Sequence, residues 1–478
     1  MSRKIWDTSD GGIIAIQQIY YFPTNHHCPN QALHHMIYKK TIPVLIGIVI
    51  FFSQYSISQE QLTNPFGNKP LKWYLNENDT QWLGLHTYLQ LWTRVNDNNP
   101  GSTVSEEIQN TTTDVSIRRF RLAIKGQLTE KLFVYTQFGT NNLNYLSGRE
   151  TSIKLLDAYA EYNFSEKFTI GGGKSLWNGL SRFSAPSTSK LMIADVPFLA
   201  LPTVNTTDDL LRNLGLYAKG KFHKMDYRFI ISKPFPIQNE IEPAEGVAEF
   251  ANTHADMQYA GYVKYEFLQP ESNKYASHRG TYLGSKRVLN VGAGFKYQSD
   301  ALCSLNEGEE QFHDMNLLAA DVFLDLPINK EKGTALSAYF GFFEYDFGPS
   351  YIRSIGANNP TNGLNPESAS FNGKGNSYPV IGTGTSVLYQ MGYLLGGIGK
   401  NRDKGKLQPY ARIQYSDFDR LDEPMISYDV GVNYFLNGHL SKFTLNAQNR
   451  PVFFDMGNTI ESKDRKWMVV LQYQFRIQ

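Results

Sequence analysis

Polar and apolar residues alternate along residues 114–139, DVSIRRFRLAIKGQLTEKLFVYTQFG. One face of this stretch begins with Arg118 and is otherwise apolar or glycine, whereas the opposite face is basic and polar. A period of two places successive side chains on opposite faces of a β-strand. The four residues 128–131 interrupt the alternation, so the pattern predicts a β-hairpin with one apolar and one polar face.

The hairpin pattern recurs along the rest of the chain. The turn FSEK at 164–167 resembles the turn LTEK at 128–131, which indicates an internal repeat of the hairpin unit. The alternation predicts 16 strands, at 84–96, 114–127, 132–139, 153–164, 168–176, 212–222, 226–233, 258–267, 288–298, 314–325, 333–346, 382–397, 406–418, 426–436, 440–449 and 466–475.

The connections between these strands alternate between short and long. Two break the rule, because 268–287 is long where a short one is due and 419–425 is short where a long one is due. Short periplasmic turns and long extracellular loops alternate in outer-membrane barrels. We therefore predict an all-β fold, a 16-stranded antiparallel transmembrane β-barrel. The predicted long loops are 97–113, 141–152, 177–211, 234–257, 299–313, 347–381 and 450–465.

Composition agrees with a barrel. Aromatic residues make up 14% of the chain and charged residues only 19%, below the quarter or so that is usual in soluble proteins. No run of 18 apolar residues follows the N-terminal leader, so a membrane protein of this sequence must be a closed barrel. In the last predicted strand, Trp467, Val469, Leu471, Tyr473 and Phe475 share one face, with aromatic residues towards both ends. That face suits contact with outer-membrane lipid.

The N-terminal region predicts export. Residues 36–58 combine a short basic start, an apolar run at 42–52 and the small residues Ser56 and Ser58, as in a secretory signal peptide. We interpret residues 1–35 as an over-extended gene start, 59–81 as a polar periplasmic lead-in and 82–478 as the barrel domain. The expected location is the outer membrane of a Gram-negative bacterium.

If the apolar faces meet lipid, the polar faces line the channel, and basic residues outnumber acidic ones among them. Rings of Lys and Arg lower the electrostatic barrier for anions. A lining that is merely polar, with its charges cancelled by loops, is the alternative. The predicted pore-lining residues are Arg94, Arg119, Arg121, Lys125, Asp157, Glu161, Lys219, Lys221, Arg228, Lys264, Lys296 and Arg412.

The connection 177–211 is longer than an ordinary loop and contains an apolar cluster from Leu191 to Leu201. Exposing this cluster to water would be unfavourable, so we predict that the loop folds into the barrel and narrows it. A subunit contact or a surface plug is the alternative. The residues expected at or near the constriction are Arg182, Lys190, Asp195 and Arg212.

The segment RRFRLAIKGQL, the paired TEK and SEK turns and GLYAKGKFHKMDYRFIISKPF at 215–235 resemble the phosphate-selective porin O and P family. The resemblance extends over about residues 82–475. It implies a trimeric outer-membrane channel with an arginine ladder and a lysine-bearing constriction for phosphate. Arg119, Arg121 and Lys125 correspond to the basic strand of that family.

The sequence thus predicts an outer-membrane porin for passive diffusion of small hydrophilic solutes, with a preference for anions and phosphate as one candidate. The alternatives are a barrel with a blocked lumen that acts as an adhesin or structural protein, and a barrel hydrolase. No enzymatic activity, cofactor, metal or nucleic-acid partner is expected. The stretch GGGKS at 171–175 lacks the first glycine of a phosphate-binding P-loop, because residue 168 is Phe.

Overall fold

The structure, a computed structural model, describes residues 71–238, 241–252, 256–397 and 405–477. The predicted gene-start extension 1–35 and signal peptide 36–58 lie outside these residues. Of the predicted lead-in 59–81, only residues 71–81 are described.

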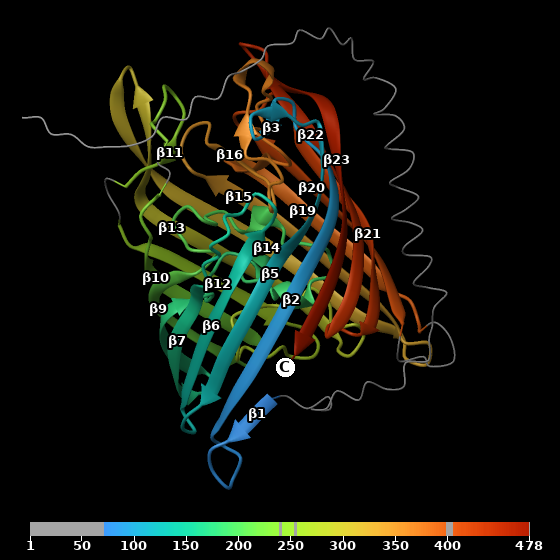
Figure 1. Ribbon diagram of the computed structural model, residues 1–478. Coiled ribbons are helices and arrows are strands. Elements are labelled where there is room, and N and C mark those ends of the chain that lie inside the picture. The colour runs from blue at the N-terminus through green and yellow to red at the C-terminus, as the bar shows by residue number, and fades with distance from the viewer. Residues whose placement is uncertain (1–70, 239–240, 253–255, 398–404, 478) are drawn as a thin grey trace, which may run out of the picture. The chain divides into compact units, whose positions relative to one another are not determined.

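Sixteen antiparallel strands close into a barrel, as the alternation predicts (Figure 1). The barrel closes where the last strand, β23, pairs with the first, β2, in a register that joins Ile477 to Thr87 and Met468 to Asn96. The barrel strands are β2 (Trp82–Asp97), β5 (Thr111–Gln127), β6 (Leu132–Leu143), β7 (Lys154–Ser165), β8 (Phe168–Ser175), β9 (Asn213–Phe222), β10 (Met225–Lys233), β12 (Gln258–Glu266), β13 (Val288–Asn306), β14 (Glu309–Asn329), β15 (Thr334–Asp346), β19 (Gly384–Leu394), β20 (Lys406–Phe418), β21 (Met425–Asn437), β22 (Ser441–Asp455) and β23 (Ile460–Ile477).

Shorter elements lie at the barrel ends and inside it. They are the strands β1 (Leu71–Tyr74), β3 (Ser102–Val104), β4 (Glu107–Ile108), β11 (Glu249–Phe250), β16 (Ile352–Ile355), β17 (Gly363–Leu364) and β18 (Tyr378–Gly382), and the 3-10 helices η1 (Arg182–Ser184), η2 (Thr188–Lys190), η3 (Phe198–Ala200) and η4 (Pro366–Ser368). Among the described residues, no helix is long and apolar enough to span a membrane.

Strand β1 lies where the first and last barrel strands meet. It pairs with β2 so that Leu71 lies opposite Leu85, directly beyond the point where Ile477 of β23 lies opposite Thr87. β1 therefore continues the edge that β23 leaves free. This part of the predicted lead-in is a strand.

The outer face of the barrel is apolar. In β23, the residues from Trp467 to Phe475 alternate between an outward set of aromatic and aliphatic side chains and a buried inward set that includes Gln472 and Gln474. Aromatic side chains gather near the short turns, where the rings of Phe164 and Phe168 lie 5.6 Å apart. An outward apolar band with interfacial aromatics is what the bilayer requires of a barrel.

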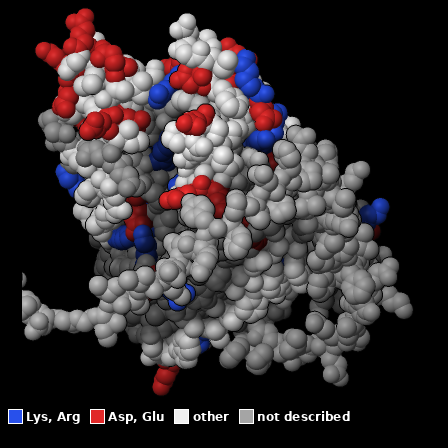
Figure 2. All heavy atoms as spheres, turned by 45° about the horizontal axis from the view of Figure 1, so that its top comes forward, with Lys and Arg blue, Asp and Glu red and all other residues white. Residues whose placement is uncertain are grey.

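Two of the predicted long loops, 299–313 and 450–465, are largely strand. β13 and β14 continue to Asn306 and Glu309, and β22 and β23 continue to Asp455 and Ile460. The prediction fails there because the strand pairing is irregular, with register shifts between Gln298 and Leu302 and between Val452 and Phe453. A bulge interrupts the period of two on which the prediction depends. In Figure 2, acidic side chains gather on the projecting end of the molecule, and Glu307, Glu309 and Glu310 are exposed at the β13–β14 tip.

Candidate functional site

The connection between β8 and β9, residues 176–212, lies inside the barrel and is called the inner loop below. It passes close to the wall at Leu180, whose backbone N–H donates to the carbonyl oxygen of Gly261 at 3.2 Å. A Cβ atom on Gly294 would lie 2.5 Å from the carbonyl oxygen of Leu180, closer than real contacts allow. Glycine at this wall position therefore permits the close approach.

The inner loop contacts strands around the barrel. Its apolar residues Leu191, Met192, Ile193, Val196, Leu199 and Leu201 are buried. Its backbone carbonyls accept hydrogen bonds from inward side chains of three strands. These donors are Tyr345 to Leu199 at 2.7 Å, Asn433 to Met192 at 2.6 Å and Lys442 to Leu191 at 3.0 Å. The loop is held by the wall because polar wall residues satisfy its backbone groups.

A second segment enters the barrel from the opposite end. Residues 267–287, the long connection among the short turns, meet the inner loop in a parallel bridge between Pro186 and His278. Ser187 donates its N–H to the carbonyl oxygen of His278 at 2.7 Å, and His278 donates its N–H to Ala185 at 2.8 Å. The two segments together form a partition across the barrel.

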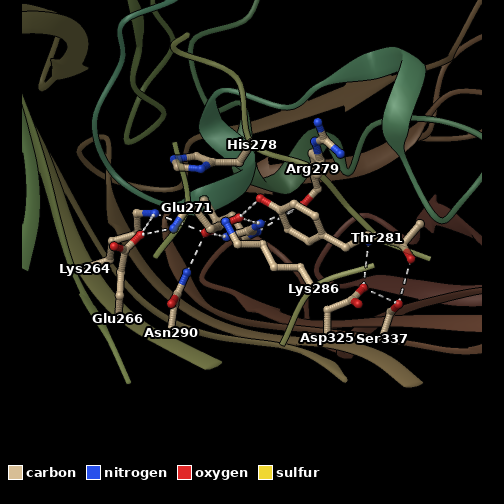
Figure 3. A network of polar contacts seen from close by, with 12 residues as sticks. Lys264, Glu266, Glu271, His278, Arg279, Thr281, Lys286, Asn290, Asp325 and Ser337 are labelled. Carbon is tan, nitrogen blue, oxygen red and sulfur yellow. Dashed lines mark hydrogen bonds and ion pairs between the residues drawn. The ribbon is translucent and has the colours of Figure 1, made fainter. Parts of the chain in front are cut away.

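Glu271 anchors this second segment (Figure 3). Its carboxylate forms a two-pronged ion pair with Arg182 of the inner loop, at 2.7 and 2.8 Å, and accepts from Lys264 of β12 at 3.1 Å. All three side chains are buried. Burial favours the neutral acid, but Arg182 and Lys264 hold the pKa of Glu271 well below its usual range. The cluster therefore fixes both entering segments to one point of the wall.

The partition has a second anchor at Asp195. This carboxylate pairs with Arg118, at 2.8 Å, and with Arg119, both on β5. The prediction that Arg118 lies on the apolar outer face is wrong. A β-bulge, at which Gln90 pairs with Arg119 but Leu91 pairs with Ile117, leaves Arg118 as an extra residue and turns its side chain inward.

A cavity of about 140 Å³, here called the turn-side cavity, lies between the partition and the wall formed by β2, β5, β6 and β7. Lys125, Lys190, Arg212 and Arg476 line it, and Asp157 is the one carboxylate among its described lining residues. Arg212 pairs with Asp157 at 3.0 Å. Lys125, Lys190 and Arg476 form no ion pair with a described residue. Lys125 and Arg476 give the cavity net positive charge, and Lys190 adds to it when protonated.

The nearby positive charges affect the protonation of Lys190. Burial, together with Arg476, Arg279 and Lys125, lowers the pKa of Lys190 to about 6. Arg476 donates through Nε to Nε2 of His86 at 2.8 Å, and the ammonium of Lys125 lies 5.1 Å from the centre of the Tyr275 ring. An anion in this cavity would relieve the repulsion between these cations.

A larger cavity of about 700 Å³, the loop-side vestibule, lies on the other side of the partition. Arg118, Arg119, Arg121 and Arg212 are among its lining residues. The two cavities share Thr188 and Arg212 in their walls, and Tyr88 is hydrogen-bonded to Thr188 between them. The two cavities therefore adjoin at Thr188 and Arg212.

The other predicted pore-lining residues all point inward, but most are paired. The pairs are Arg94 with Asp114 at 2.8 Å, Glu161 with Lys219 at 2.8 Å, Lys221 and Lys264 with Glu266 at 2.6 and 2.9 Å, and Arg412 with Asp429 at 2.5 Å. Lys296 donates to Thr203 at 3.0 Å, and Arg228 donates to the carbonyl oxygen of Ala276 at 2.7 Å.

The wall also carries charged residues of both signs that the alternation did not assign to the lining, the cations being Arg118, Lys442, Arg450 and Arg476. Asp114, Asp226, Asp321, Asp325 and Asp429 are also buried and were absent from the predicted lining. Inward cations without an ion pair to a described residue lie at the turn-side cavity and at Arg121, and also at Arg228, Lys296, Lys442 and Arg450, which donate to neutral oxygens.

Several residues of this site are missing from the sequence prediction. Arg476 continues the inward series of Gln472 and Gln474, so the alternation contained the signal for it. Glu271 lies in a connection without periodicity, and no local pattern marks it. Of the predicted constriction residues, Lys190 and Arg212 line the turn-side cavity, whereas Arg182 and Asp195 are held in ion pairs.

The closed barrel, its apolar outer band and its charged interior define this chain as an outer-membrane β-barrel protein. Residues 87–233 match the family described as phosphate-selective porin O and P, so the resemblance is confirmed over that segment.

Solved porin structures are also similar. OmpF of Salmonella typhi in complex with daunomycin is 11% identical, with a TM-score of 0.49, over 85% of this chain and all of that one. The anion-selective porin from Comamonas acidovorans is 10% identical, with a TM-score of 0.45, over 83% of this chain and all of that one. The outer-membrane channel DcaP of Acinetobacter baumannii is 11% identical, with a TM-score of 0.45, over 83% and 97%. No curated protein matches this chain.

Proposed function

We propose that this barrel is a passive channel for small hydrophilic solutes and that it prefers anions. The observation that carries the proposal is the turn-side cavity, in which Lys125, Lys190 and Arg476 have no carboxylate partner among the described residues. Positive charge inside a low-dielectric wall raises the local concentration of anions and lowers their barrier to passage. Inorganic phosphate is one such anion, and the match to the phosphate-selective porin O and P family supports it as a substrate.

The proposed route follows the wall of β2 and β5. A solute would cross the loop-side vestibule, pass Arg121 and the Tyr88–Thr188 contact, and reach the turn-side cavity. Arg121 donates to the carbonyl oxygen of Thr140 at 2.8 Å and forms no ion pair with a described residue, so its charge is available to the solute. Passage requires the Tyr88–Thr188 hydrogen bond to open.

Reversal potentials in planar bilayers under a salt gradient test the proposal. The wild-type chain should show stepwise conductance with a reversal potential on the anion-selective side. Lys125→Gln and Arg121→Gln should each move the reversal potential towards zero. Arg149→Gln is the matched control, because Arg149 is exposed on a loop and lines neither cavity. A cation-selective wild-type channel would refute the anion preference.

The partition supports a second candidate function, a barrel with a blocked lumen that acts as an adhesin or structural protein. Folded, membrane-inserted protein that carries no current would favour this candidate. The barrel and the family match fit a protein without enzymatic activity. The resemblance also leads us to propose a homotrimer, which sedimentation of the detergent-solubilised protein would test.

A further inference from the structure

The loop-side vestibule has an unusual lining for a passage that serves only small inorganic ions. Besides the arginines of β5, it has a large apolar surface contributed by the inner loop, β16 and the connection between β10 and β12. The residues of this surface include Phe198, Val204, Ile237, Phe250, Tyr351 and Ile352. The charged side chains of the vestibule therefore lie beside apolar side chains, which form no favourable interaction with an inorganic ion.

Arg353 of β16 stands within this apolar surface. Its Nη1 donates to the hydroxyl of Thr206, and its side chain also interacts with the hydroxyl of Tyr351. Nε and Nη2 are buried and have no well-formed hydrogen bond to a described residue. Glu249 is the one carboxylate among the described lining residues, and it interacts electrostatically with Arg353 without direct ion-pair contact. Buried guanidinium N–H groups are rarely left without acceptors, so the geometry favours an acceptor supplied from outside.

Arg121 supplies a second positive charge to the same vestibule. Carbonyl oxygens of Phe120 and Thr140 orient its guanidinium, at 2.7 and 2.8 Å, and leave its charge without a carboxylate partner. Arg118 and Arg119 are already engaged by Asp195. The vestibule therefore offers two available guanidinium groups, at Arg121 and Arg353, next to aliphatic and aromatic side chains.

The vestibule also has the size of a small-molecule site. Pockets that hold organic ligands typically measure roughly 300–1,000 Å³, and they combine apolar walls with a few oriented polar groups. The volume of about 700 Å³ falls in this range. An apolar group placed there would leave water and cover apolar wall, which is favourable.

We propose that the loop-side vestibule binds organic anions in which a phosphate or carboxylate group is joined to an apolar or aromatic body. The anionic group pairs with Arg353 or Arg121, and the body contacts the apolar wall. This inference rests on the proposed anion channel and deepens it, because it names the chemical class that the loop side selects.

Block of the wild-type channel by two matched probes tests the proposal. Phenyl phosphate and methyl phosphate carry the same anionic group and differ in the size of the apolar body. Each is added to one side of a planar bilayer and then to the other, and the half-blocking concentration is measured. Phenyl phosphate should block from the loop side at a concentration about tenfold lower than methyl phosphate, a factor equivalent to a modest apolar contact.

Variants separate the two parts of the site. Arg353→Gln should weaken block by both probes about tenfold, the effect of losing one charge-assisted hydrogen bond. Val204→Thr, a change of nearly equal volume, should weaken block by phenyl phosphate and leave methyl phosphate unchanged. Ile352→Thr is a second apolar-wall variant on an element that tolerates β-branched residues. Arg149→Gln again serves as the charge-matched control.

Equal block by the two probes would overturn the inference, as would phenyl phosphate block that none of the variants changes. In either case an anion-selective reversal potential would leave the proposed function standing. Loss of anion selectivity in the wild-type chain would instead refute the proposed function. If the barrel carries no current, titration calorimetry of the detergent-solubilised chain with both probes decides the same question.

Discussion

Arg118 and Asp195, 77 residues apart in the sequence, form a largely buried ion pair with 2.8 Å between Nη2 and Oδ2. The pair connects a barrel strand to the loop inside the barrel. Arg119 binds the same carboxylate, and the guanidinium of Arg118 also lies 5.3 Å from the centre of the Trp92 ring. Burial raises the pKa of Asp195, but the two arginines more than offset this and lower it.

The first prediction concerns this contact. Asp195→Asn leaves two buried guanidinium groups without a counter-charge. Breaking a buried pair from one side should lower the free energy of unfolding by about 3 kcal/mol. Denaturant titration of the refolded protein in detergent or vesicles measures this change.

Asp464→Asn is the control for that experiment, because Asp464 forms an exposed ion pair with Lys466 at 3.0 Å. Exposed pairs contribute little to stability, so its midpoint should stay close to wild type. Equal effects of the two variants would show that Asp195 does not anchor the inner loop.

The second prediction concerns the segment 267–287. Glu271→Gln removes the charge that holds Arg182 and Lys264 together. The partition should loosen, so the conductance of the folded channel should rise and the connection should become sensitive to protease. Single-channel recording and limited proteolysis measure the two effects. Glu309→Gln at the exposed β13–β14 tip should change neither, and a conductance unchanged in Glu271→Gln would contradict the anchoring role.

The third prediction concerns pH. With a pKa of about 6, Lys190 is neutral above that pH and becomes positively charged as the pH falls through it. Lys125, Arg476, Arg279 and His86 lie around it. Each added positive charge favours anions, so anion preference should increase as the pH is lowered through about 6, as measured by reversal potentials.

Two variants at this position check the assignment. Lys190→Gln should remove the pH step, because the side chain is neutral throughout. Lys190→Arg should show high anion preference at both ends of the range, because a guanidinium stays protonated. A pH step that survives in both variants would assign the titration to another group.

The fourth prediction concerns the approach of the inner loop to the wall. In Gly294→Ala, the new Cβ would lie 2.5 Å from the carbonyl oxygens of both Gly261 and Leu180. Both the loop and the neighbouring strand β12, which contains Gly261, must adjust, at a cost of roughly 1–3 kcal/mol. Gly148→Ala makes the same change where nothing lies within 4 Å, and it should leave the unfolding midpoint unaltered. Equal midpoints would show that the loop does not approach this wall.

The sequence by itself determined the barrel. Each strand faces lipid on one side and the interior on the other. In every strand, therefore, a period of two separates lipid-facing residues from interior-facing residues. For this reason the 16 strands, the inward Gln472 and Gln474, and the unusual long connection at 268–287 were all predicted from local pattern. The same pattern did not predict how far some strands continue, as β13 does to Asn306 and β22 to Asp455.

Only the tertiary structure decided the site. The bulge at Arg118 reverses the alternation by one residue, and the strand pairing that creates it involves β2, which is distant in the sequence. Glu271 meets Arg182 through two segments that enter the barrel from opposite ends. Such contacts depend on which residue of the barrel wall each loop reaches. The loop sequences contain no periodic pattern from which these contacts could be predicted. The barrel strands could therefore be predicted from the sequence, because contact with the bilayer imposes a regular alternation on them. The arrangement of the segments inside the barrel could not, because it depends on long-range ion pairs and close packing.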